Sequence, residues 1–484
     1  MNHADARYVG RRRPLEIVGH ADLERIHGAA LEILAETGCM MHSVRALDAL
    51  EAHGATVDRR ATTARIPASA VQEALATLPG SFTLGGREPE FDLPLDGEHV
   101  YLTSDGCATM VREADGTIRP STKNDVYEAA RVVEGLDNLS ATSALVSAQD
   151  TPEESRVLHE FDACLRGSRK HAIVVSMKDS TEARALIRMA EAVAGGSAEL
   201  KERPAFTVIL ATVSPLHQER FGMDLALTLA EAGIPFMLYP MPILGATGPV
   251  TPAGTAVVGA AEILAAVTAV QLACPGAKII HAGGPTALFM RTGSYFANVP
   301  EALLLRALQG QMARYWGLPA GLGWGGTKAK QPEAQAAYEN TLGLILELMS
   351  GADFLFGAGL LDSVQLMSLE ELVVADEVFG MATQLVRGVT VDREHLAVDL
   401  IKKLGFRGDY LFEQHTREHV RELWQARLGE TGTYESWKNA GSPRLQDKAR
   451  AVADGILATP APEFPEELGR EFDEIIAAVE SGRF

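Results

Sequence analysis

Short apolar segments alternate with longer amphipathic stretches along the middle of the chain. Eight such segments begin about 29 to 43 residues apart, as from 206 to 235 and from 235 to 278, which is the length of one strand, one helix and two loops. The units share no consensus residues, which argues against a stacked-repeat protein. The pattern predicts a TIM (β/α)8 barrel, with strands at 101–104, 141–148, 172–177, 206–213, 235–244, 278–283, 319–325 and 353–360.

The longer stretches carry the residues that begin and end helices. Thr251 precedes Pro252 at one start, and Gly195 follows an apolar-periodic run that begins at Ser180. Barrel helices are therefore predicted at 124–135, 152–167, 180–195, 217–233, 251–274, 300–317, 332–351 and 368–388.

Two flanking regions lie outside the predicted barrel, which spans residues 99–390. Residues 1–98 form an N-terminal extension, helical over 20–80, with a short helix that opens at Ala68 after Pro67. Residues 391–484 form a charged, helical C-terminal arm, interpreted as a cap or a dimerisation arm. The turn residues Asp115 and Gly116 predict a β-hairpin between 109–113 and 117–119.

The predicted helix at 251–274 carries a single charged residue, Glu262. A helix that is apolar all round is buried all round. Its length fits a membrane span, but its small residues and flanking strands favour the barrel. We expect the barrel to cover one face, and another subunit of a homo-oligomer or the C-terminal arm to cover the other. Glu262 itself is either functional or hydrogen-bonded to backbone.

Composition excludes several classes of partner. The chain has 44 Lys and Arg against 64 Asp and Glu, a net charge of −20, and no basic run beyond residues 11–13. Nucleic acid and anionic membranes are therefore not expected as partners. The cysteines show neither metal-ligand nor disulfide spacing, which predicts a reducing cytoplasm. A signal or transit peptide is not expected, because an apolar h-region is not evident near the N-terminus. No metal site is expected, because the strand ends lack a convincing His/Asp/Glu ligand set. The four cysteines are Cys39, Cys107, Cys164 and Cys274.

The predicted strand ends supply the candidate site, since barrel enzymes carry their chemistry there. Asp105 follows the first strand, His281 ends the sixth, and a glycine-rich loop around Trp324 follows the seventh. These glycines match neither a dinucleotide fingerprint nor a P-loop. Aromatic residues in nearby loops predict a cation–π cage for a quaternary ammonium ion, with ordinary packing as the alternative for each ring. The cage residues are Trp324, Tyr239, Phe289, Tyr295 and Phe296.

Six segments carry a resemblance to a known family: 248–251, 261–265, 317–319, 327–339, 410–416 and 437–441, of which 335–339 is the most specific part. They resemble the trimethylamine methyltransferase family, whose members move a methyl group from a methylated amine to the cobalt of a separate corrinoid protein. Family members with pyrrolysine carry it in the barrel; this chain has ordinary residues throughout, and the corresponding position is expected within 328–331. Members without pyrrolysine resemble demethylases of quaternary amines such as glycine betaine.

The resemblance implies a methyltransferase that moves a methyl group from a betaine-like quaternary amine to Co(I) of a corrinoid protein. The cobalamin is carried by that partner, and this chain binds no cofactor. Trp324 and Tyr239 would hold the ammonium group, and Glu262 or Asp105 would supply negative charge. Residues expected to grip a substrate carboxylate or complete the binding site are His281, Arg291, Lys328, Lys330 and Gln331.

Three alternatives stay open at this point. The first is a methyltransferase of the same kind that acts on trimethylamine or another methylated amine. A binding or sensor protein for a betaine-like osmolyte fits the same fold without chemistry. A metal-dependent aldolase or lyase is a third class, disfavoured by the missing ligand set.

Overall fold

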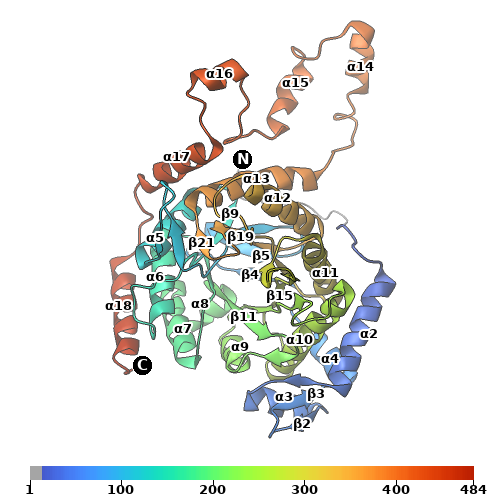
Figure 1. The fold of residues 1–484 in the computed structure, drawn as a ribbon, viewed down its shortest axis with the longest axis vertical. Coiled ribbons are helices and arrows are strands. Elements are labelled where there is room, and N and C mark those ends of the chain that lie inside the picture. The colour runs from blue at the N-terminus through green and yellow to red at the C-terminus, as the bar shows by residue number, and fades with distance from the viewer. Residues whose placement is uncertain (1–13) are drawn as a thin grey trace.

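The barrel predicted from the sequence is present and closed. The computed structural model describes residues 14–484, so the arginines at 11–13 lie outside the described residues. Eight parallel strands form a ring, because β19 pairs with β6 as well as with β18 (Figure 1). In chain order the barrel strands are β6 (Tyr101–Ser104), β9 (Leu139–Ser143), β10 (His171–Val174), β11 (Phe206–Val213), β13 (Phe236–Tyr239), β15 (Ile279–Gly283), β18 (Ala320–Gly323) and β19 (Phe354–Ala358).

A long helix follows each barrel strand and packs outside the ring. Gly195 and Gly317 end two of these helices in the left-handed conformation, as the sequence indicated. At the start of α7 the capping residue is Asp179 rather than Ser180, since its carboxylate accepts the amides of Thr181 and Glu182. The outer helices are α5 (Lys123–Gly135), α6 (Arg156–Gly167), α7 (Ser180–Ala194), α9 (Gly222–Glu231), α10 (Pro252–Ala273), α11 (Pro300–Trp316), α12 (Ala334–Met349) and α13 (Leu369–Arg387), with a short α8 (Ser197–Glu202) after α7.

The N-terminal helices cover the outer face of α10. Helix α2 (His20–Glu36), α3 (Val44–Ala52) and α4 (Ala68–Leu75) all pack against it. The expectation that another subunit or the C-terminal arm covers α10 is therefore wrong, because α2 presents its own apolar stripe, led by Leu23 and Ile26. Within the described residues, α10 is the one helix long and apolar enough to cross a membrane, and 72% of its most apolar window is buried. Its burial is that of a core helix, and the predicted homo-oligomer no longer draws support from it.

Short strands extend the fold at both ends of the barrel. The antiparallel pair β4 (Phe82–Leu84) and β5 (Leu93–Leu95), joined by η1 (Pro89–Phe91), was not predicted; its apolar side chains enter the barrel interior with Tyr101 and Phe354. The predicted hairpin at 109–119 is present as β7 (Met110–Arg112) and β8 (Ile118–Pro120). The other short strands are β1 (Cys39–Met40), β2 (Thr56–Asp58), β3 (Thr63–Arg65), β12 (His217–Gln218), β14 (Ile243–Leu244), β16 (Thr286–Phe289), β17 (Ser294–Phe296), β20 (Leu360–Leu361) and β21 (Leu366–Met367).

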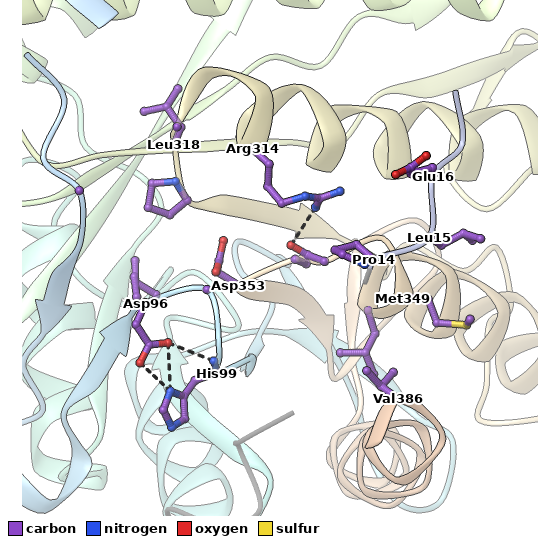
Figure 2. Close-up of a pocket in the computed structure, with 18 of the residues that line it drawn as sticks. Pro14, Leu15, Glu16, Asp96, His99, Arg314, Leu318, Met349, Asp353 and Val386 are labelled. Carbon is purple, nitrogen blue, oxygen red and sulfur yellow. Dashed lines mark hydrogen bonds and ion pairs between the residues drawn. The ribbon is translucent and has the colours of Figure 1, made fainter. Parts of the chain in front are cut away.

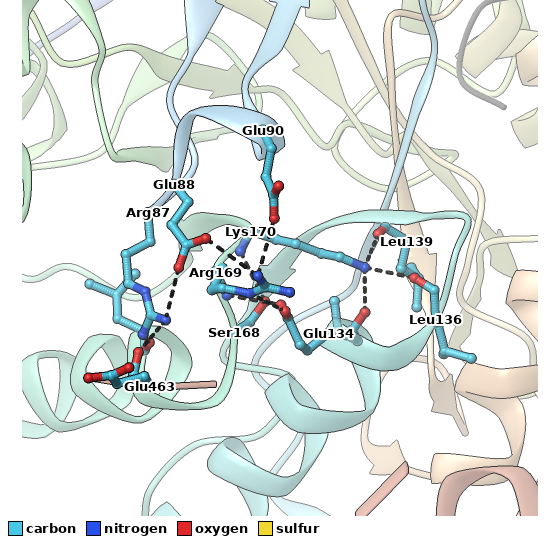
Figure 3. A network of polar contacts seen from close by, with 12 residues as sticks. Arg87, Glu88, Glu90, Glu134, Leu136, Leu139, Ser168, Arg169, Lys170 and Glu463 are labelled. Atoms are coloured by element: carbon cyan, nitrogen blue, oxygen red, sulfur yellow. Dashed lines mark hydrogen bonds and ion pairs between the residues drawn. The ribbon is translucent and has the colours of Figure 1, made fainter. Parts of the chain in front are cut away.

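Buried polar contacts hold the N-terminal end of the barrel together (Figure 3). The ammonium of Lys170, 1% exposed, donates to the carbonyls of Val133, Leu136 and Leu139 at 2.6–2.7 Å. Val133 and Leu136 lie in the last turn and at the C-cap of α5, and Leu139 begins β9, so the charge stabilises a helix C-terminus and ties it to the barrel. Arg87 donates to the carbonyl of Glu463 at 2.7 Å and thereby links the β4–β5 hairpin to the C-terminal region.

The C-terminal region has a packed part and a projecting part. Helix α17 (Leu445–Leu457) packs on α13 and α5, and α18 (Glu466–Glu480) packs on α7 and α6. By contrast, α14 (Val398–Leu404), α15 (Gln414–His419) and α16 (Tyr434–Asn439) stand away from the barrel (Figure 1). Two 3-10 turns, η2 (Gly405–Arg407) and η3 (Val420–Glu422), lie between them. The helical nature of this region is as predicted; its assignment as a separate arm from residue 391 stays a prediction.

Candidate active site

The candidate site is a cavity of about 430 Å³ at the C-terminal ends of the barrel strands. Asp105 after β6, Tyr239 at the end of β13 and Gly323 at the end of β18 all line it. Its position is the one at which barrel enzymes assemble reacting groups from several strands. Chemistry is therefore expected here.

A larger cavity, of about 640 Å³, lies at the opposite end of the barrel (Figure 2). Its polar groups are hydrogen-bonded to one another. Asp96 contacts the ring of His99 at 2.9 Å, and Arg314 donates to the carbonyl of Gly351 at 3.1 Å. The Asp353 carboxylate accepts the amide of Ala320 at 2.7 Å. Because these contacts join the starts of strands and the ends of helices, we interpret this end as a stabilising one.

Asp105 supplies negative charge to the cavity at the C-terminal ends. Its carboxylate accepts a hydrogen bond from the amide of Gly106 at 2.9 Å, and no basic side chain of the described residues forms an ion pair with it. Burial raises the pKa of Asp105 to about 6, and the Gly106 amide partly offsets that effect. A carboxylate in such surroundings is stabilised by a cation that enters the cavity.

Three aromatic rings form a wall of the same cavity. Tyr239 and Phe356 meet edge to face with ring centroids 6.0 Å apart, and Tyr295 lines the cavity from β17. The Tyr295 hydroxyl donates to the carbonyl of Ser363 at 2.9 Å, which fixes the ring. Burial raises the pKa of Tyr295 to about 12 and that of Tyr239 above its usual range, so both phenols stay neutral. Neutral aromatic rings beside one carboxylate suit a cation that lacks hydrogen-bond donors.

Glycines make room for the Tyr239 ring. A Cβ added at Gly284 would lie 2.5 Å from the Tyr239 hydroxyl, and one added at Gly323 would lie 2.6 Å from it. Farther along the loop, a Cβ at Gly325 would lie 2.5 Å from the Cα of Gly357, so two backbones cross in contact. The glycine-rich strand ends thus admit an aromatic side chain and a neighbouring loop.

A buried ion pair supports the inner side of the cavity. Arg306 of α11 lines the cavity, and its Nε donates to Glu347 of α12 at 2.5 Å. Its other nitrogens donate to the carbonyl of Ala297 and the side chain of Asn298, both at 2.9 Å. Sequence reasoning missed Arg306; the available signal was a single cation within an otherwise apolar part of the predicted helix.

A cysteine also lies in the cavity but is not a thiolate. The Sγ of Cys107 lies 2.8 Å from the hydroxyl of Ser176, and burial raises the pKa of the thiol to about 12. A protonated thiol is a poor nucleophile. All four cysteines of the chain are free.

Trp324 is not a cage residue, contrary to the prediction. Its side chain is 1% exposed, does not line the cavity and belongs to the core between the barrel and its outer helices. The reason is the alternation of side chains along an extended segment, which turns Gly323 and Gly325 toward the cavity and Trp324 away from it. Phe356, which sequence reasoning missed, takes the corresponding place in the wall, and its signal was the same alternation along β19.

Two of the residues predicted to be catalytic, Glu262 and His281, do not line the cavity. The Glu262 carboxylate accepts hydrogen bonds from Thr212 at 2.5 Å, Ser214 at 2.9 Å and the amide of Leu216 at 2.9 Å, so it holds the loop after β11 and lies outside the cavity. His281 also lies outside it, with its ring 5.4 Å from that of Trp316. Burial lowers the pKa of His281 to about 3, which leaves the ring neutral. Neither residue faces a substrate in the cavity.

The remaining predicted binding residues are dispersed around the rim. The ammonium of Lys328 lies 5.3 Å from the ring centre of Tyr295, which itself lines the cavity. Lys330 pairs with Asp362, and Gln331 donates to Glu333 at 3.0 Å. Those that do not line the cavity, in contrast to the prediction, are Phe289, Phe296, Arg291, Lys328, Lys330 and Gln331.

The barrel and the cavity at its C-terminal mouth define a barrel enzyme, and comparisons with known proteins identify the family. Residues 1–481 match the family model described as trimethylamine methyltransferase (MTTB). The chain therefore belongs to the trimethylamine methyltransferase family and is a methyltransferase, as its sequence resemblance implied.

Named relatives span nearly the whole chain. It is 30% identical over 476 residues to trimethylamine methyltransferase MttB of Desulfitobacterium hafniense (strain DSM 10664 / DCB-2), covering 98% of this chain and 96% of the relative. It is 28% identical over 451 residues to the glycine betaine methyltransferase of Desulfitobacterium hafniense (strain Y51), covering 92% and 93%. The crystal structure of the Methanosarcina barkeri monomethylamine methyltransferase (MtmB) matches with a TM-score of 0.53 at 13% identity, covering 94% of this chain and 89% of that one, which shows the shared fold.

Proposed function

We propose that this methyltransferase takes its methyl group from a betaine-like quaternary amine and passes it to the reduced cobalt of a corrinoid carried by a partner protein. The observation that carries the proposal is the composition of the cavity, in which the carboxylate of Asp105 faces the same space as the rings of Tyr239, Tyr295 and Phe356. A quaternary ammonium ion has no N–H to donate, so aromatic faces and a carboxylate bind it without leaving an unpaired hydrogen bond.

The reaction requires the protein to position the substrate and does not require a protein nucleophile. When bound at the cavity mouth, the partner's Co(I) would supply the electron pair of the new carbon–cobalt bond, while the pair of the broken C–N bond leaves with the nitrogen. The leaving group is then a neutral tertiary amine, which needs no proton from the protein. The aromatic wall and Asp105 hold the nitrogen so that one methyl group points out of the cavity.

Moderate binding of the cation suits this reaction. The positive charge disappears as the amine leaves, so interactions that stabilise the bound cation more than the transition state slow the transfer. One half-buried carboxylate and three rings give less attraction than a fully buried ion pair. Lys328 lies beside the cavity residue Tyr295, and we assign to its ammonium the contact with the carboxylate of a betaine.

Exposed apolar side chains near the cavity mouth suit a docking protein. They belong to the end of β11 and to the segments that follow β11, β13 and β15. Met241 among them also lines the cavity. Met290 and Val250 both lie over Gly245. Phe289, which is not a cage residue, belongs to this surface. Its exposed members are Val213, Phe221, Met241, Val250, Phe289 and Met290.

Methyl transfer is tested with the purified full-length protein. The protein is mixed with Co(I) cobalamin, or a cognate corrinoid protein, and with glycine betaine, proline betaine, carnitine or trimethylamine; methylcobalamin is followed by its absorbance. We expect transfer from a quaternary amine. Asp105→Asn should weaken it at least about tenfold by loss of the charge, whereas Asp115→Asn, in the exposed β7–β8 turn, should leave it unchanged.

Each other outcome contradicts a defined part of the proposal. Transfer from trimethylamine alone overturns the quaternary substrate. Calorimetric binding of a betaine without transfer to any cobalt acceptor favours the sensor alternative. Absence of both binding and transfer across the panel overturns the assigned cavity.

A further inference from the structure

The projecting segment, residues 389–427, has no apolar core of its own. Among its described side chains none is buried, and α14 and α15 have only 7 and 6 residues (Figure 1). Helices of that length are unstable without tertiary support. Some other interaction must therefore hold this segment in a defined shape.

Three metal-ligating side chains meet where the projecting segment returns toward the barrel. His395 precedes α14, His419 ends α15, and Glu422 lies in η3 one turn later. One ligand atom from each lies within 4.8 Å of the other two. The Glu422 carboxylate is 3.6 Å from Nε2 of His395 and 2.6 Å from Nδ1 of His419. Two ligand atoms on one tetrahedral zinc ion are ~3.3 Å apart, so these spacings bracket the required one.

Asp392 and Glu394 lie beside the two imidazoles, on the sides away from Glu422. Asp392 lies 2.8 Å from Nδ1 of His395, which leaves Nε2 of that ring directed toward Glu422. Glu394 lies 3.6 Å from Nε2 of His419, on the opposite side of the ring from Glu422. Metal-bound histidines typically have a carboxylate or carbonyl at the nitrogen that does not bind the metal.

Ion pairing without a metal accounts poorly for this arrangement. The side chains of His395 and Glu422 are 30% and 56% exposed, and exposed ion pairs stabilise little. A third imidazole, His415, lies with its ring centre 4.3 Å from that of His419, and the Nε2 atoms of both rings are shielded from solvent without a hydrogen bond. His419 would bind through Nδ1, the atom that faces Glu422, so the unpaired nitrogen that remains beside the three ligands is Nε2 of His415.

We propose that His395, His419 and Glu422 bind one Zn²⁺ ion, which closes the 395–419 loop and fixes the shape of the projecting segment. Two imidazoles and one carboxylate favour zinc over magnesium, and the fourth position is available to water or to His415. Cross-linking residues 24 positions apart lowers the entropy of the open segment. The absence of a metal site expected from the sequence rested on the strand ends, whereas these ligands lie outside the barrel.

Zinc titration of the full chain tests the site. After chelation and dialysis, the protein is titrated with Zn²⁺ by calorimetry, and bound zinc is counted by elemental analysis. We expect one tight site per chain. Its Kd should rise at least about 100-fold in His419→Ala and Glu422→Gln, and about 10- to 100-fold in Asp392→Asn. The control is His159→Ala, since His159 is 18% exposed and pairs with Glu480 at 3.1 Å, much as His419 is 17% exposed and pairs with Glu422.

Proteolysis of the unmodified protein gives a second measurement that needs no variant. Lys402 and Lys403 are exposed trypsin sites within the closed loop. Zn²⁺ should slow cleavage there, and Mg²⁺ should not. Zinc binding that is equal in His419→Ala and His159→Ala, protection by Mg²⁺ equal to that by Zn²⁺, or cleavage indifferent to zinc would each overturn the proposal. None of these measurements depends on methyl transfer.

Discussion

Arg306 and Glu347 form an ion pair that is 1% and 0% exposed, and the same arginine lines the cavity. The pair joins α11 to α12 and holds the carbonyl of Ala297. Glu347 depends on it, because burial raises the pKa of this carboxyl and Arg306 opposes that effect. The end of the barrel that holds the candidate site is therefore stabilised by an ion pair within the cavity wall.

Removal of one partner should destabilise the fold strongly. Arg306→Met leaves a buried carboxylate without its cation, and we expect a loss of about 3–5 kcal/mol in the free energy of unfolding. Urea denaturation followed by circular dichroism measures it. Arg25→Met, which breaks the exposed pair with Asp22, serves as the control and should cost less than about 1 kcal/mol.

The double variant Arg306→Met/Glu347→Leu should recover most of that loss. Replacement of both charges by apolar groups of similar volume removes the desolvation cost of each ion. A double variant no more stable than Arg306→Met would show that the hydrogen bonds to Ala297 and Asn298, rather than the charge pair, hold the wall.

Asp105 should make binding of a cationic substrate dependent on pH. Its carboxyl has a pKa of about 6 in the folded protein, against an ordinary value of 3.8. The carboxylate that binds a cation is therefore fully present above about pH 7 and is lost as the pH falls through 6. We expect kcat/KM for a quaternary amine to fall about tenfold per pH unit below 6. Glycine betaine titrations at pH 5 to 8 measure it.

Asp105→Asn separates this effect from general acid inactivation. The variant should have low, flat kcat/KM between pH 5 and 7. It should also raise the melting temperature at pH 8, because burial penalises the charged form in the wild type and the amide has no charge. A wild-type profile that is flat down to pH 5 would contradict the assigned role of Asp105.

The sequence predicted the ring of strands well because each barrel strand is a local apolar run with helix signals on both sides. It failed where the direction of a side chain depends on its exact position in an extended segment, in which successive side chains face opposite sides. Trp324 was expected in the cage, yet it lies between Gly323 and Gly325, which face the cavity. A shift of one position along an extended segment reverses the side that a residue faces.

Contacts between residues far apart in the chain could not be predicted from the sequence either. The apolar surface of α10 correctly indicated burial, but the pattern does not say which element provides the cover; α2, α3 and α4 do so. Glu262 was left open between function and hydrogen bonding. Its partners lie about 50 residues earlier in the chain: Thr212 in β11 and Leu216 in the loop that follows. Asp105, Tyr239 and Tyr295 were found because they directly follow strands or lie in their loops.

Substitutions in the aromatic wall should separate binding from folding. We expect Tyr295→Leu and Phe356→Leu each to raise KM for a quaternary amine about 3- to 30-fold, because each removes one face from the cation. Trp324→Leu should lower the melting temperature and leave KM unchanged, since this ring packs in the core. Steady-state kinetics with thermal melts decides between them. A rise in KM for Trp324→Leu equal to that for Tyr295→Leu would show that Trp324 contributes to substrate binding.

Gly323→Ala should displace the Tyr239 ring, and removal of one hydroxyl should restore it. The added Cβ would lie 2.6 Å from the Tyr239 hydroxyl, while the other neighbouring atoms lie at 3.8 Å. We expect kcat/KM to fall about tenfold as the cage opens. Gly323→Ala/Tyr239→Phe should recover most of it, because the clashing oxygen is gone and the ring face remains.

Gly284→Ala is the matched control for this rescue. Its Cβ would approach ring carbons of Tyr239 at 3.2 Å as well as the hydroxyl at 2.5 Å, so Tyr239→Phe should rescue it only in part. Methyl-transfer assays on Gly323→Ala and Gly284→Ala, each with and without Tyr239→Phe, distinguish the two positions. Melting temperatures of the four variants check their folding. Equal rescue at both glycines, or no loss in Gly323→Ala, would show that Tyr239 is not held by these contacts. The aromatic wall would then owe its shape to Phe356, which meets Tyr239 edge to face, rather than to the glycines.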